Sequence, residues 1–62
     1  MVIEVKPYNE FLRALGNIMG YKAVTQKQGM IYLYDGVATN LQHMICEQNG
    51  IELKYERCLF ID

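Results

Sequence analysis

The fold predicted for this chain depends on Tyr21–Tyr34, which reads YKAVTQKQGMIYLY. Its two ends, 21–26 and 30–34, are rich in residues that favour strands, and a short polar stretch with a glycine separates them. Glycine supplies the positive φ that a tight turn needs. The stretch therefore predicts an antiparallel hairpin in which Val24 lies opposite Leu33, with one aliphatic and one aromatic face.

A strand and a helix are predicted before this hairpin. Met1 to Lys6 alternates in the manner of a short strand, and Pro7 ends it. A helix then begins either with Pro7 in its first turn or with Asn9 as its cap, and it ends at Gly20, where glycine suits a left-handed cap. The apolar face of this helix comprises Tyr8, Phe11, Leu12, Leu15, Ile18 and Met19.

A second helix and a last strand are predicted after the hairpin. Thr39, with Gln42 three residues later, fits a capping box, and Asp35 is an alternative start for the same helix. The last segment, 51–62, begins with the alternation of a strand, and Arg57 breaks that pattern.

The resulting order, β-α-β-β-α-β over the single domain 1–62, predicts a ferredoxin-like α+β sandwich. In that fold two helices cover one face of an antiparallel sheet of four strands. If Met1 to Lys6 is not a strand, the alternative is α-β-β-α-β with a three-stranded sheet. The expected core comprises Phe11, Leu15, Ile18, Ile31, Leu33, Leu41, Ile45 and Leu53.

Composition limits the classes of partner. The net charge of -1 provides no broad basic field for nucleic acid. No apolar run approaches the roughly 20 residues that span a bilayer, and the start of the chain lacks the pattern of a signal peptide. Cys46 and Cys58 are too few for a disulfide scaffold. We therefore expect a cytoplasmic protein with free thiols and no membrane partner.

The chain offers weak candidates for catalysis or metal binding. His43 and Cys46 are three residues apart on the second helix, but no further group is placed to orient the pair. A zinc site needs about four ligands, and the chain has one histidine. Glu52 and Glu56 alternate with Lys54, which is typical of a solvated sheet surface. We expect no enzymatic activity, no cofactor and no metal.

Tyrosines are the strongest binding candidates. Tyr21, Tyr32 and Tyr34 are predicted to share the sheet face that lies away from the helices, where nothing else in the sequence covers them. Tyrosine is enriched in protein interfaces. Aromatic side chains on an open sheet also stack nucleic-acid bases, so nucleic-acid binding, with Lys6, Lys22 and Lys27 as phosphate contacts, is the alternative.

A homodimer is predicted at the end of the chain. A domain this small buries only about 60% of the surface of its unfolded form, so self-association is a common source of stability. The apolar run Cys58, Leu59, Phe60 and Ile61 is the predicted dimer interface.

The preferred functional class is a non-enzymatic protein-interaction module. It would act as a small adaptor, regulator or inhibitor on a protein of unknown identity, and chains of this size are often encoded by phages and other mobile elements. Small-molecule binding at a subunit interface is a further alternative, because one copy is too small to enclose a typical pocket of about 300 Å³ or more.

Overall fold

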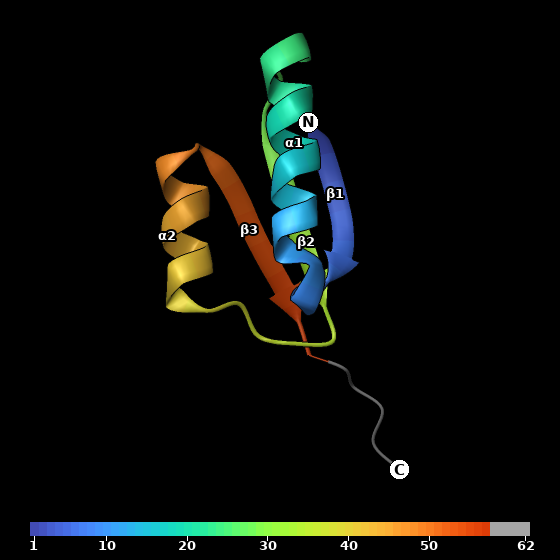
Figure 1. Cartoon of the computed structure of the whole chain (residues 1–62), viewed down its shortest axis with the longest axis vertical. Helices are drawn as coiled ribbons and strands as arrows, with labels where there is room; N and C mark the ends of the chain where they lie inside the picture. Colours follow the sequence, from blue (N-terminus) through green and yellow to red (C-terminus); the bar gives the residue numbers. More distant parts are fainter. Residues whose placement is uncertain (58–62) are drawn as a thin grey trace.

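The computed structural model describes residues 1–57, in which strands and helices alternate (Figure 1). β1 (Val2–Pro7) leads through a short 3-10 turn (Tyr8–Glu10) into α1 (Phe11–Thr25). The order then continues with β2 (Gly29–Tyr34), α2 (Asn40–Gln48) and β3 (Ile51–Glu56). The strands form a three-stranded sheet in the order β1-β2-β3, and both pairings are parallel.

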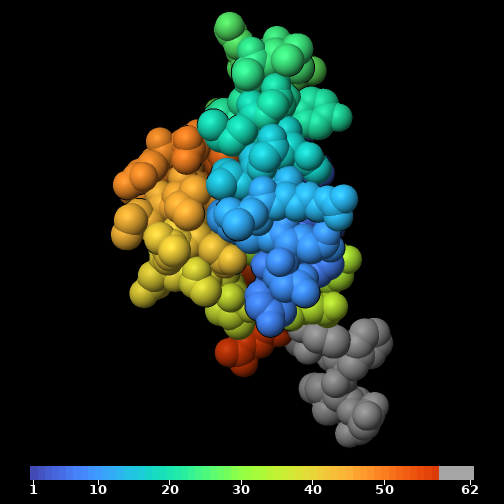
Figure 2. Space-filling view, in the orientation of Figure 1, coloured from blue at the N-terminus to red at the C-terminus, as the bar shows by residue number. Residues whose placement is uncertain are grey.

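Both helices cover the same face of this sheet. A Cβ atom placed on Gly29 would lie 2.9 Å from the Ile18 side chain of α1, so this side of β2 faces α1. Leu33 lies on the same side of β2 and is level with Tyr55 of β3. The Tyr55 ring meets His43 of α2 edge-on, with 5.9 Å between the ring centroids. Figure 1 shows α1 in front of β2 and α2 beside β3, and in Figure 2 the two helices hide most of the strands from view.

The predicted antiparallel, ferredoxin-like fold is wrong, and so is the α-β-β-α-β alternative. Both predicted folds contain the hairpin, whereas residues 21–25 form the last part of α1. The whole of α1 is the helical crossover that joins β1 to β2. A helix that returns the chain along the sheet makes the strands parallel. The coarser expectation of a small domain with helices and strands is confirmed, and the predicted first strand is present as β1.

The end of α1 was misplaced because Gly20 does not cap it. Gln26 adopts the left-handed conformation instead, with φ of 58°, and its N–H donates to the Lys22 carbonyl at 2.9 Å. The Thr25 hydroxyl donates to the Tyr21 carbonyl at 2.8 Å. The left-handed cap at Gln26 therefore closes a last helical turn whose residue types favour strands.

The length of α1 matches the strands it connects. A strand of 6 residues is about 20 Å long at about 3.3 Å per residue. The 15 residues of α1 span about 22 Å, whereas a helix ending at Gly20 would span only about 15 Å. The crossover thus needs the additional turn to reach the start of β2. Within residues 1–57, neither helix is long and apolar enough to cross a membrane.

The start of α2 follows the predicted capping box. The Gln42 N–H donates to the Thr39 hydroxyl at 3.1 Å, and the Thr39 N–H donates to the Gln42 side chain at 3.0 Å. Asp35, the alternative start, lies instead in the turn after β2 with φ of 62°. Gly50 has φ of 66° and leads into β3.

The core lies between the sheet and the two helices. Among the predicted core residues, Leu15, Ile45 and Leu53 are only partly buried, and Leu41 is 63% exposed, so its assignment is wrong. Cys46, which the predicted core did not include, is buried. The buried cluster comprises Phe11, Ala14, Ile18, Ile31, Leu33, Ala38, Cys46 and Ile51.

Candidate binding face of the sheet

The sheet face opposite the helices carries a group of apolar side chains from β1 and β2. Side chains alternate along a strand, so the residues next to the buried Ile31 and Leu33 point to this face. The parallel register then places the neighbours of β1 and β2 side by side. We call this group the open-face patch, and it consists of Ile3, Val5, Met30, Tyr32 and Tyr34.

The open-face patch is accessible. Ile3 and Val5 are 54% and 55% exposed, Tyr34 is exposed as well, and Met30 and Tyr32 are half-buried. Isolated exposed apolar residues are common, but a contiguous group on adjacent strands is typical of an interaction surface. The patch therefore qualifies as the candidate site on geometry.

Charged side chains of β3 border the patch. Glu52, Lys54 and Glu56 are exposed and lie level with Met30, Tyr32 and Tyr34 in turn. The Tyr32 hydroxyl donates a hydrogen bond of 2.5 Å to the Glu56 carboxylate. This bond, with a smaller contribution from desolvation, raises the pKa of Tyr32, because the negative carboxylate favours the protonated phenol.

The predicted tyrosine trio is only partly brought together. Tyr32 and Tyr34 lie on the open face, as expected from the alternation of β2. Tyr21 is an exposed residue of α1, because the predicted hairpin does not exist. It lines an open groove of about 610 Å³ on the β1 side of α1, together with Val24 and with Glu4 of β1.

The sequence prediction missed the contribution of β1 to this face. The alternation of Met1, Ile3 and Val5 was visible, but the incorrect hairpin gave β2 the wrong neighbour.

Of the lysines proposed as phosphate contacts, Lys22 donates from its amino group to the Gly50 carbonyl at 3.2 Å on the helix side of the sheet. The predicted dimer interface of Cys58, Leu59, Phe60 and Ile61 lies outside the described residues.

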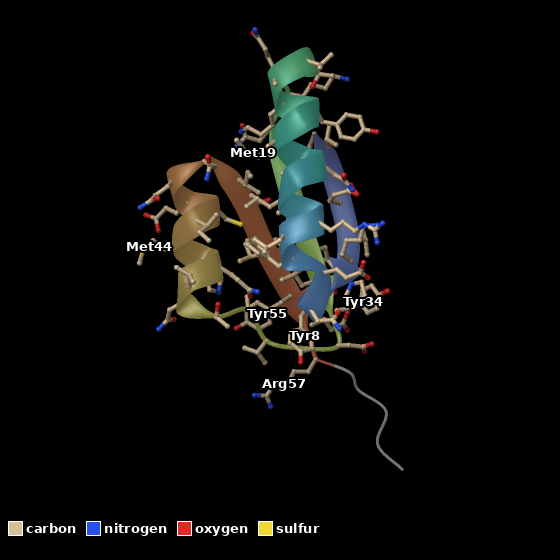
Figure 3. The ribbon with its side chains drawn as sticks, in the orientation of Figure 1. Tyr8, Met19, Tyr34, Met44, Tyr55 and Arg57 are labelled. Atoms are coloured by element: carbon tan, nitrogen blue, oxygen red, sulfur yellow. The ribbon has the colours of Figure 1, made fainter. Side chains whose placement is uncertain are left out.

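Further aromatic side chains lie toward the end of the sheet where the strands terminate. Figure 3 shows Tyr8, Tyr34 and Tyr55 there, with Arg57 just beyond them. A Cβ atom on Gly36 would lie 2.3 Å from the Tyr8 ring, so only glycine leaves room for this ring. Tyr8 therefore packs against the loop after β2.

The two catalytic candidates of α2 lie in different surroundings. Cys46 is buried, and burial raises the pKa of its thiol, which disfavours the nucleophilic thiolate. His43 is an exposed residue whose ring packs edge-on against Tyr55 of β3. Across residues 1–57, no group of three or more His, Cys, Asp or Glu side chains is placed to hold a metal ion.

Residues 1–57 form a small parallel α/β domain whose helices cover one sheet face and leave the other open. No protein-family model, no curated protein and no solved structure matches the chain. The chemistry of the open face is therefore the basis on which a function is proposed.

Proposed function

We propose that this chain is a non-enzymatic protein-interaction module, acting as a small adaptor, regulator or inhibitor, whose open-face patch docks a partner protein. The observation that supports the proposal is the contiguous exposure of Ile3, Val5 and Tyr34 across two adjacent strands. A partner that covers this face removes apolar surface from water, which favours binding by about 25 cal/mol per Å². Tyrosine adds a large ring that loses little rotamer entropy on binding.

The border of the patch indicates the chemistry of the partner. Glu52 and Glu56 lie on either side of Lys54 along β3, so the border carries an excess of negative charge. A complementary partner would present apolar side chains with a basic residue beside them. The same border disfavours the nucleic-acid alternative, because the carboxylates would repel phosphates.

Site-specific photo-crosslinking tests the proposal in cells that naturally express the chain. We expect p-benzoylphenylalanine introduced at Tyr34 to crosslink a discrete protein. The same photoprobe at Gln48, an exposed residue of α2, should not. Crosslinking from the α2 position alone would contradict the proposed face.

The captured protein then allows a quantitative test. The double variant Tyr32→Ala, Tyr34→Ala should weaken its binding by at least about 30-fold, equivalent to about 2 kcal/mol. Circular dichroism should show that the variant remains folded. Wild-type affinity in the folded variant would contradict the proposal, as would tight, salt-dependent binding of a fluorescent single-stranded oligonucleotide to the wild-type chain.

A further inference from the structure

The outer edge of β1 has backbone groups without partners among the described residues. β1 is an edge strand, paired only with β2. The Val2 N–H donates to the Gln28 carbonyl at 2.8 Å, so the backbone groups of Val2 face β2. Because these groups alternate along a strand, those of Ile3, Val5 and Pro7 face outward. Pro7 fits this position, since proline in a sheet is confined to edges where no donor is needed.

An exposed edge of this kind pairs readily with another strand. β1 has 6 residues, and its open-face side chains Ile3 and Val5 carry no charge that would keep a second strand away. Glu4 and Lys6 lie on the other face of the same strand, two residues apart. This charge pattern is complementary to itself when the strand is reversed.

We propose that two copies of the chain associate through antiparallel pairing of their β1 strands about a two-fold axis at Val5. This register places Glu4 opposite the second copy's Lys6, and Lys6 opposite the second copy's Glu4. Registers centred on Glu4 or on Lys6 would instead place like charges directly opposite each other, which is destabilising. Charge complementarity therefore selects both the partner and the register.

The backbone groups that face outward are the ones this register uses. Val5 pairs with its own copy through N–H and carbonyl groups, and the Ile3 N–H donates to the second copy's Pro7 carbonyl. The two-fold axis is perpendicular to the sheet, so the two sheets join edge to edge with their helices on the same face. The two open-face patches become continuous across the axis.

The flank of α1 next to β1 provides a second contact. Val24 is 85% exposed and Tyr21 is 52% exposed, and both line the groove beside β1. Gly16 and Gly20 line the same groove, and a Cβ atom on either would meet nothing within 4 Å. In the dimer the two α1 helices lie antiparallel above the joined strands, where this groove receives the second helix.

The register is tested by reversing charges in the full-length chain, without reference to any docking partner. Wild-type protein should sediment as a dimer at micromolar concentration. Glu4→Lys and Lys6→Glu should each weaken self-association at least about tenfold at low salt, because each creates like-charge pairs. The double variant Glu4→Lys, Lys6→Glu should dimerise again, and an equimolar mixture of the two single variants should form a heterodimer.

Several outcomes would overturn the proposal. The first is a wild-type chain that stays monomeric at about 100 μM. The second is a pair of single variants that dimerise as well as wild type, and the third is a double variant that is folded but stays monomeric. Truncation after Arg57 is the control that separates this dimer from one built on residues 58–61. A dimer that is lost on truncation and unaffected by the charge reversals would place the interface at the end of the chain.

Discussion

At the scale of single residues, the distinction between buried and exposed apolar side chains decides stability. Ile18 is fully buried between α1 and β2, where it also lies against Gly29, whereas Leu41 is 63% exposed. Both residues were predicted to belong to the core. Their substitutions therefore separate the observed core from the expected one.

Ile18→Ala should lower the free energy of unfolding by about 2 to 5 kcal/mol, because it removes buried methylene groups and leaves a cavity. Leu41→Ala should change that free energy by less than about 0.5 kcal/mol. Urea titrations followed by circular dichroism measure both. Since Ile18→Ala can unfold so small a domain completely, Ile18→Val, with an expected loss of about 0.5 to 1.5 kcal/mol, keeps the comparison measurable. Equal losses for Ile18→Val and Leu41→Ala would contradict the observed core.

The hydrogen bond between Tyr32 and Glu56 predicts a dependence on pH. The pKa of Tyr32 is raised in the folded state above the value of about 10 of an unfolded tyrosine. The bond therefore contributes its full stability below pH 10, and this contribution is lost as the pH rises through the folded pKa. Glu56→Gln should lower the pKa of Tyr32, since it removes the negative charge.

The ring carbon that bears the Tyr32 hydroxyl reports this titration in ¹³C NMR. Tyr32→Phe is the matched control, because it identifies the resonance and removes the donor while keeping the ring. An unchanged Tyr32 titration in Glu56→Gln would show that the carboxylate does not hold the phenol.

At the scale of elements, periodicity predicted most helices and strands, and tertiary contacts decided where one of them ends. The first strand, the burial of Phe11 and Ile18, and the capping box of α2 were correct. The other half of the predicted apolar face, Tyr8, Leu12 and Met19, is exposed. Residues 21–25 have strand-forming types, yet the crossover to a parallel β2 requires helix there. Local propensity carries no information on that requirement.

The orientation of α2 shows a second limit of the sequence pattern. Leu41 and Ile45 suggested one buried face, but the helix buries Cys46 and leaves Leu41 exposed. Two faces of a short helix can both look apolar, and the neighbouring strand decides which is buried. The placement of Tyr32 and Tyr34 was predictable because strand alternation is local, whereas their neighbours Ile3 and Val5 depended on the strand order.

At the scale of the whole molecule, the order β1-β2-β3 explains why one sheet face is open. Helical crossovers usually cover both faces of a parallel sheet when the strand order reverses direction. Here each crossover moves one strand further in the same direction, and both helices lie on one side. The open-face patch and the unpaired edge of β1 both follow from this topology.

The parallel sheet is tested most directly by a nuclear Overhauser spectrum of the isotopically labelled full chain. The parallel order predicts contacts between Val5 and Tyr32 and between Tyr32 and Lys54, which lie level on adjacent strands. It also predicts helical chemical shifts for residues 21–25. Contacts between Val24 and Leu33, with strand shifts in 21–25, would instead establish the hairpin and contradict the parallel sheet with its open face.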